Sequence, residues 1–429
     1  MTAGGRDGGR VTLRRTTPDA LPEKGHGAVD RDTLERAAVI VDDVRAHGEP
    51  ALRRWAETLG DIAPGAPLVI GKDALKAAFE SLSPADQALL ERTATRVRTF
   101  AEAQRSSLRD AVVHVPGGQA GHTVSPVERA GCYAPGGRFP LPSSVIMTAV
   151  TARAAGVEVV WVASPRPAPV TLAAAHAAGA DALLAVGGAQ AIAALAYGAG
   201  PVPACDVVVG PGNRWVTAAK KLVAGDVGID MLAGPSELVV LADGAADPDV
   251  IAADLLAQAE HDPDAVPVLV TTDAALADRV DVALASQLET LPTAATAREA
   301  LNNGAAVIAA SLDEACAACN RLAPEHLEVM VADPWSIAPR LTHYGGLFVG
   351  GWAAEVLGDY GAGPNHVLPT GRTARHTGGL SVLTFLRVRT WLEVTDLTAA
   401  AEVVVDAAAL ARHEGLEAHA RAAEKRRRG

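Results

Sequence analysis

The chain has 429 residues, more than one hydrophobic core usually organises, so we expect at least two domains with room for a cleft between them. Its composition, 49% hydrophobic and 21% charged residues, is that of a globular protein, and the formal net charge of -12 argues against a nucleic-acid scaffold, which needs a basic surface. Four cysteines are too few for a disulfide framework, and no apolar stretch approaches the ~20 residues that span a bilayer, so we expect a cytoplasmic protein.

The first distinct segment is residues 1–25. It contains four arginines with no apolar stretch behind them, which argues against a secretory signal and predicts a flexible N-terminal arm. Residues 30–60 and 71–104 then carry apolar side chains at helical spacing, with Asp and Ser near their starts. These residues are predicted to form helices that pack on another part of the protein.

From Pro126 onward, short β-branched runs alternate with alanine-rich helical stretches. Continuously apolar strands separated by helices are buried on both faces, which is typical of a parallel, doubly wound sheet. The runs are numerous enough to predict an α/β fold with two α/β domains rather than one very wide sheet. They cover residues 157–165, 181–188, 206–210, 237–243, 267–273, 304–310, 326–333 and 345–351.

We divide the chain into two domains and a C-terminal segment. Residues 26–127 and 238–379 are assigned to a first α/β domain, and residues 128–237 to a second α/β domain. Residues 380–429 return to a helix-like sequence rich in Ala and Leu, and are predicted to form a small C-terminal helical segment.

A glycine- and proline-rich loop, residues 131–142, precedes a helical run that Ser143 and Ser144 open. Backbone N–H groups at the start of a helix can bind an anion such as a dinucleotide pyrophosphate. Most loops of this composition are only loops, however, and residues 209–215, VGPGNRW, have only the first half of the G-x-G-x-x-G motif. Any dinucleotide site in this chain is therefore predicted to be of a non-standard kind.

Gln258 and His261 lie three residues apart on a predicted helix, so both side chains project from one face at a spacing suitable for one metal ion. The alternative is a histidine that interacts with the C-terminal end of the helix before Pro263. For such a pair taken by itself, that alternative is the commoner explanation.

Glu325 and His326 are adjacent and come just before a predicted strand, where functional groups can face a crevice. The environment can move the pKa values of both residue types towards neutrality, which suits general acid/base partners. A polar turn with a solvated carboxylate is the simpler explanation of the pair by itself.

Two further stretches combine carboxylates with imidazoles. Residues 358–371, GDYGAGPNHVLPTG, present Asp359 and His366 on a glycine-rich turn after a strand, an arrangement that is more often an active site than a structural turn. Near the C-terminus, Glu414 and His419 lie on one short predicted helix, for which an exposed amphipathic helix is the alternative.

The cysteines suggest a separate possibility. Cys316 and Cys319 form a C-x-x-C without a second pair, so buried thiols are a better explanation than a zinc finger. A thiolate at Cys132 could trap an aldehyde, although no obvious base lies beside it.

In order and spacing, these segments resemble the histidinol dehydrogenase family from about Pro126 to His419. No single segment would establish the resemblance, but eight match in sequence. They are CYAPGG, VGGAQAIAALAYG, VVGPGNRWVTAAKK, VGIDMLAGPSEL, AQAEHD, APEHLE, GDYGAGPNHVLPTG and GLSVLTFL.

The resemblance implies a homodimer with two Rossmann-like domains in each subunit and a C-terminal segment that crosses to the partner. It also implies oxidation of L-histidinol to L-histidine, the last step of histidine biosynthesis, with one zinc ion per subunit and two NAD molecules reduced. Glu325 and His326 would be the acid/base pair. The implied zinc ligands are Gln258, His261, Asp359 and, from the other subunit, His419; the implied substrate contacts also include Ser236, His326, His366 and Glu414; the implied NAD contacts are Tyr133, Gln190 and Asn213.

Other functions remain open on the sequence. Departures from the family pattern could reshape the cofactor pocket or the substrate entrance, so a relative that oxidises another polar hydroxy compound is one alternative. A catalytically silent, dimeric binding protein is the second. The departures are Phe139, Leu141, Arg214, Trp215, Pro364, Arg372 and His376.

Overall fold

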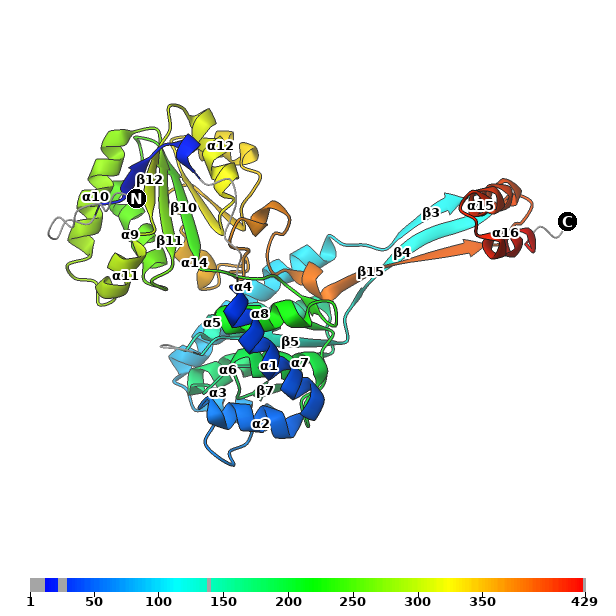
Figure 1. Ribbon diagram of the computed structural model, residues 1–429. Helices are drawn as coiled ribbons and strands as arrows, with labels where there is room; N and C mark the ends of the chain where they lie inside the picture. Colours follow the sequence, from blue (N-terminus) through cyan, green and yellow to red (C-terminus); the bar gives the residue numbers. More distant parts are fainter. Residues whose placement is uncertain (1–11, 22–28, 137–139, 427–429) are drawn as a thin grey trace.

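A computed structural model describes residues 12–21, 29–136 and 140–426. Two α/β lobes contain one six-stranded sheet each, which we call sheet A and sheet B, and the three-stranded sheet C forms an arm that extends away from both lobes (Figure 1). The predicted α/β fold with two Rossmann-like domains is confirmed. Among the described residues, no helix is both long and apolar enough to cross a membrane.

Sheet A is wholly parallel, with the strand order β1-β12-β11-β10-β13-β14. Alternate residues of its central strand face two different cores: Leu238 and Val240 pack against α9, α10 and α11, whereas Val239 and Leu241 pack on the side of α12. Burial on both faces explains the continuous apolar runs. The strands are β1 Arg14–Thr16, β10 Glu237–Ala242, β11 Val266–Thr271, β12 Ala305–Ile308, β13 His326–Met330 and β14 Gly346–Val349; the helices are α9 Pro248–Ala259, α10 Ala274–Gln287, α11 Ala294–Ala300, α12 Leu312–Leu322, α13 Pro334–Ile337 and α14 Glu355–Asp359.

Sheet B has the order β2-β7-β6-β5-β8-β9, and only β2 runs antiparallel to its neighbour. Helices α3 to α6 cover one face, and α1, α2, α7 and α8 cover the other. The strands are β2 Val69–Gly71, β5 Arg129–Tyr133, β6 Val159–Ala163, β7 Ala182–Leu184, β8 Val207–Val209 and β9 Gly228–Ile229; the helices are α1 Arg31–His47, α2 Glu49–Thr58, α3 Lys72–Glu80, α4 Pro84–Ser106, α5 Pro142–Ala155, α6 Pro169–Ala177, α7 Gly188–Tyr197 and α8 Arg214–Val223.

The two sheets share one topology. In each, the first strand of the unit is central (β10 or β5), the next two strands lie on one side of it, and the last two lie on the other. In such folds, ligands bind at the carboxyl edge between the first and fourth strands, where the chain direction across the sheet reverses. For sheet B this crevice lies between β5 and β8.

The predicted grouping of residues 26–127 with residues 238–379 is wrong. Helices α1 to α4 pack on sheet B, where Ala37 and Val41 join the core formed with α7, and β2 pairs with β7. An amphipathic pattern shows which face of a helix is buried but not which sheet buries it.

Part of the predicted flexible arm is ordered. β1 is a parallel edge strand beside β12, Leu13 is buried, and the Leu13 backbone N–H donates to the Asp281 carboxylate at 2.9 Å. The partner strand lies far away in the sequence, so the local composition did not reveal it. The other residues of the predicted arm, 1–11 and 22–25, lie outside the described residues.

Sheet C was not predicted. It consists of β3 (Ala111–Val115), β4 (Gly118–Pro126) and β15 (Leu386–Val394), all antiparallel, and it leads to α15 (Ala401–His413) and α16 (Glu417–Glu424). The C-terminal helices agree with the prediction, but β15 does not. Most of its residues are exposed on both faces, so the strand lacks the alternation that marks one buried face. Short 3-10 turns complete the chain at Pro18–Ala20, Ala338–Arg340, Thr373–Arg375 and Val382–Phe385.

Candidate active site

The amino edge of sheet A brings together the predicted acid/base pair and the start of the central strand. His326 begins β13 and Glu325 directly precedes it, beside Glu237 at the start of β10. The Glu325 carboxylate accepts a hydrogen bond from the Glu237 backbone N–H at 3.0 Å, and His326 Nδ1 lies 3.2 Å from the Glu237 carbonyl oxygen. Because a carbonyl only accepts, Nδ1 is the protonated nitrogen and Nε2 carries the lone pair.

His326 Nε2 is the reactive atom of this arrangement. It is buried, it has no hydrogen-bond partner among the described residues, and it lies 3.7 Å from an oxygen of Asp359. A buried nitrogen that is left unpaired is costly, and such atoms often mark a catalytic or ligand-binding position. The geometry therefore offers a proton acceptor beside a carboxylate.

A metal ion fits the same place. His326, Glu355 and Asp359 each offer one ligand atom, and these atoms lie within 4.8 Å of one another. Gln258 is completely buried next to them, and its amide nitrogen can donate to both Glu355 oxygens at 3.2 Å. In that orientation the amide oxygen is the atom left to bind a cation.

Glu355 was missed in the sequence. It stands four residues before Asp359 on α14, so both carboxylates share one helix face, and this spacing is the signal that could have revealed it. The Glu355 backbone N–H donates to the buried Glu328 carboxylate at 2.7 Å. The start of the helix is thereby fixed against β13.

The predicted zinc ligands are only partly assembled within one chain. Gln258 and Asp359 lie beside His326, and His261 follows the end of α9, near enough for its charge to influence the pKa of His326. By contrast, Glu414 and His419 are exposed at the far end of the arm, on the residues that join and form α15 and α16 (Figure 1). One chain therefore does not bring Glu414 and His419 together with His326, Glu355 and Asp359.

His366 connects the two lobes. Its Nδ1 lies 2.9 Å from the Asp359 carbonyl oxygen, and its Nε2 lies 3.4 Å from Ser144 Oγ on α5. Asn365 next to it donates to the Met147 carbonyl at 2.8 Å. Since α5 begins at the carboxyl edge of sheet B, the amino edge of sheet A and the carboxyl edge of sheet B meet here. Ser236 directly precedes β10 and therefore lies at the same amino edge of sheet A.

The three predicted NAD contacts all lie at the carboxyl edge of sheet B. Tyr133 ends β5, Gln190 lies in the first turn of α7, and Asn213 caps α8 through its side-chain oxygen. Tyr133 and Gln190 are buried, and the Gln190 amide donates to Asp61 at 2.8 Å. Asn213 is exposed. The structure therefore brings the three together where a Rossmann-like domain binds its nucleotide.

Burial determines the electrostatics of the pair. It lowers the pKa of His326 to about 4, so the imidazole is neutral at physiological pH. Burial also raises the pKa of Glu325 well above 4.5, and the nearby negative charges of Glu237 and Asp359 raise it further. The imidazole is therefore unprotonated at Nε2 and has a lone pair available, and the raised pKa makes the Glu325 carboxylate a stronger base than a solvated one.

The effect of burial on these pKa values can be tested at Glu237. Burial raises its pKa from 4.5 to about 7, and its side chain accepts a hydrogen bond from the Gly371 N–H at 3.0 Å. The unfolded chain loses this proton at lower pH than the folded chain, so wild-type stability should fall as the pH rises from 4.5 to 7. Glu237→Gln keeps the acceptor oxygen and cannot titrate.

We therefore expect the free energy of unfolding of the variant, relative to wild type, to increase by up to about 3 kcal/mol between these two pH values. Urea denaturation at each pH measures the difference. A difference that stays constant with pH would contradict the raised pKa.

Cys132 is not a nucleophile in this structure. It is fully buried, and burial raises the pKa of its thiol to about 12. Cys316 and Cys319 are also buried and unpaired, as predicted.

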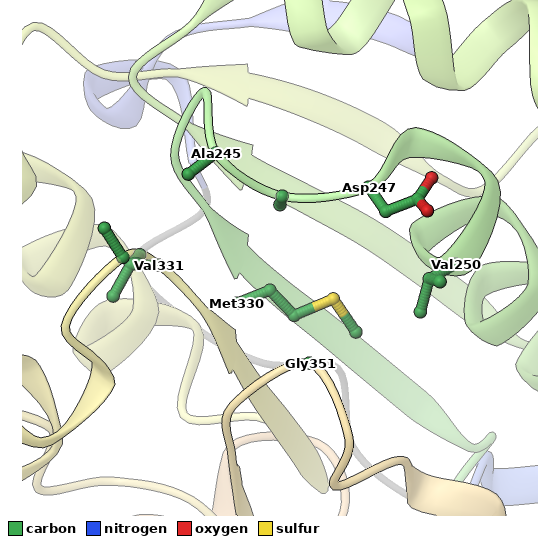
Figure 2. Close-up of a pocket in the computed structure, with 8 residues that line it drawn as sticks. Ala245, Asp247, Val250, Met330, Val331 and Gly351 are labelled. Carbon is green, nitrogen blue, oxygen red and sulfur yellow. The ribbon is translucent and has the colours of Figure 1, made fainter.

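A cavity of about 200 Å³ lies at the opposite, carboxyl edge of sheet A. Figure 2 shows Ala245 and Asp247, before α9, across from Met330 and Val331 at the end of β13. None of the predicted site residues lines it. The cavity is lined by Ala245, Ala246, Asp247, Val250, Met330, Val331, Ala332 and Gly351.

Several departures from the family pattern lie at the carboxyl edge of sheet B, where α5 and α8 begin. The Arg36 guanidinium lies 4.9 Å from the ring centre of Trp215, and Leu141 caps α5. Arg372 adopts a left-handed backbone, with φ of 69°, and its charge opposes the raised pKa of Glu237. Phe139 lies outside the described residues.

The comparisons with known proteins agree with the resemblance. A sequence model described as "Histidinol dehydrogenase" matches residues 25–427. The chain is 48% identical to a histidinol dehydrogenase of Thermus thermophilus, covering 90% of this chain and 93% of the relative, and 45% identical to one of Haloarcula marismortui, covering 96% and 99%. The crystal structure of histidinol dehydrogenase from Elizabethkingia anophelis superimposes with a TM-score of 0.90 at 29% identity, covering 96% of this chain and 98% of that one. The chain therefore belongs to the histidinol dehydrogenase family, a family of NAD-dependent oxidoreductases.

Proposed function

We propose that the protein oxidises L-histidinol to L-histidine through the aldehyde, in the cytoplasm, as the last step of histidine biosynthesis. The observation that carries the proposal is His326, whose Nδ1 is held by the Glu237 carbonyl while Nε2 faces Asp359 without a partner. The family of the chain and the buried carboxylates around this nitrogen support the same reaction.

In the first oxidation, His326 Nε2 takes the proton of the substrate hydroxyl, and the hydride of the same carbon passes to NAD. In the second, Glu325 takes a proton from water as the water adds to the aldehyde. As the water adds, the aldehyde oxygen takes up the proton held by His326. Nε2 then accepts a hydroxyl proton of the hydrate while the hydride passes to a second NAD, which leaves the carboxylic acid. His366 spans from Asp359 to α5, so the substrate would lie between the acid/base pair and the cofactor at sheet B.

We propose one zinc ion per subunit, held by Gln258, His261, Asp359 and His419 of the partner subunit. When bound, the ion would orient the substrate by taking its nitrogen or oxygen atoms and would polarise the reacting group. The Asp359 and Glu355 carboxylates and the buried Gln258 amide fit a cation beside His326, because such groups are costly to bury without one.

A homodimer with shared active sites is part of the proposal. Glu414 and His419 lie at the end of an arm that carries them away from the cluster of their own chain. The arm also exposes large apolar side chains that a second copy would cover. They include Val112, Val113, Val388, Leu392 and Leu410.

The metal assignment is tested by His261→Asn. We expect the variant to lose most of its bound zinc, and with it NADH formation from histidinol, because a ligand is removed. Zinc is measured by metal analysis after dialysis, beside the exposed His47→Asn as a control that should keep both zinc and activity. Full zinc content in His261→Asn would contradict the assignment.

The substrate is tested separately. Zinc-loaded wild type should form NADH with histidinol faster than with other amino alcohols or with hydroxy sulfonates. A faster reaction with one of those compounds would favour the relative with another substrate. Stoichiometric zinc without turnover of any of them would favour the silent binding protein.

A further inference from the structure

We infer that Lys220 and Asp230 are positioning residues for the cofactor loop, which we define as residues 210–213. The inference rests on the NAD site proposed at the carboxyl edge of sheet B. It concerns how that edge of the sheet is held in shape.

The two side chains form a buried ion pair around a single residue, Gly210. The Lys220 and Asp230 side chains are 2% and 0% exposed, and the ammonium group is hydrogen bonded to the carboxylate. Lys220 Nζ also donates to the Gly210 carbonyl oxygen at 3.0 Å, while Asp230 accepts the Gly210 N–H at 2.7 Å. Both backbone polar groups of Gly210 are therefore held by one ion pair.

The backbone at Gly210 has no room for a side chain. It follows β8, its φ is +116°, and a Cβ atom there would collide with the Tyr133 carbonyl oxygen. This close approach joins the ends of β5 and β8, the two strands that flank the nucleotide crevice. Asn213, three residues on, caps α8. The conformation of Gly210 thus sets where the two predicted NAD contacts Tyr133 and Asn213 lie relative to each other.

The Lys220–Asp230 pair also fixes the connection to the sheet A lobe, which contains Glu325 and His326. Asp230 accepts the Met231 N–H at 2.7 Å, and Thr217, one turn before Lys220 on α8, donates to the Ala233 carbonyl at 2.9 Å. The chain then runs directly to Ser236 and β10. Displacement of the pair would move the cofactor loop and this connection together.

Stability alone does not explain a buried ion pair here. Removing two charges from water is costly, and an apolar pair of similar volume is often as stable or more stable. An apolar pair could not hold the N–H and the carbonyl of Gly210 at once. We therefore infer that the pair holds the cofactor loop in position and acts through this loop rather than on the substrate.

The test is the double variant K220M/D230N, which removes both charges. Lys220→Met alone would leave a buried carboxylate uncompensated and would report mainly on folding. We expect the KM and the Kd for NAD to rise about tenfold or more, because a loop displaced by about 1 Å loses its preorganised contacts. The zinc content should change little, which a general loss of stability would not produce.

A matched control is R15M/D281N, which removes another ion pair that holds a backbone N–H, that of Leu13, at the edge of sheet A. It should lower Tm without changing NAD binding. A folded, zinc-loaded K220M/D230N with the wild-type Kd for NAD would overturn the inference.

Equilibrium dialysis measures NAD binding without turnover, so the two proposals can fail separately. Wild type that binds NAD but leaves histidinol unoxidised would refute the proposed substrate and not the positioning pair. Wild type that does not bind NAD would refute both.

Discussion

Replacing His326 with alanine should reduce the rates of both oxidation steps about 10²- to 10⁴-fold, the usual contribution of a positioned general acid/base. The reason is that the unpaired Nε2 is the only imidazole nitrogen the described residues place beside Asp359 with its lone pair free of a hydrogen bond. NADH formation is measured once from histidinol and once from the aldehyde, at saturating NAD.

His326→Asn is the control for this result. Its amide can still donate to the Glu237 carbonyl but cannot act as a base, so it should lose as much activity as the alanine variant while it keeps Tm closer to wild type. If either variant retained activity within about tenfold of wild type, His326 would not be the base.

Glu325→Gln should reduce the oxidation of the aldehyde about 10²-fold or more, and should affect the oxidation of the alcohol much less. Only the second step consumes water, and an amide cannot take its proton. The glutamine oxygen can still accept the Glu237 N–H, so the strand edge should keep its shape. The two half-reactions are compared by supplying the aldehyde directly.

An equal loss of both half-reactions in Glu325→Gln would refute the role assigned to this carboxylate. Glu355→Gln is a useful comparison because Glu355 is also a buried carboxyl group near His326 and lies next to the proposed metal site. We expect it to affect zinc content, which Glu325→Gln should not.

The sequence predicted the class of fold because buried parallel strands leave a strong local pattern. Val239 and Leu241 face one core and Leu238 and Val240 the other, so β10 reads as a continuous apolar run. The sequence did not predict which sheet buries α1 to α4. That choice depends on contacts between segments far apart, such as β2 with β7, which no local pattern contains.

The sequence predicted the site as separate pairs of residues, such as Gln258 with His261 and Glu325 with His326. The fold explains why these pairs lie close together. Helix α9 runs back from the carboxyl edge of sheet A, so Gln258 near its end reaches the amino edge where His326 begins β13. Glu355 escaped prediction because a single glutamate on a short helix resembles a solvated side chain until its burial is known. The roles of Glu414 and His419 cannot be read from one chain, because their proposed site belongs to another copy.

The position of β1 has a consequence for synthesis of the chain on the ribosome. Arg14 pairs with Ala305, and the whole of sheet B lies between them in the sequence. All the strands of sheet B have emerged once β9 is made, and only a few residues of its core, among them Val382 and Phe385, come later, whereas β1 must wait for β12. Contacts between such distant segments form slowly. We infer that the sheet B lobe folds first and that closure of the β1 edge comes late, after most of the catalytic lobe has been translated.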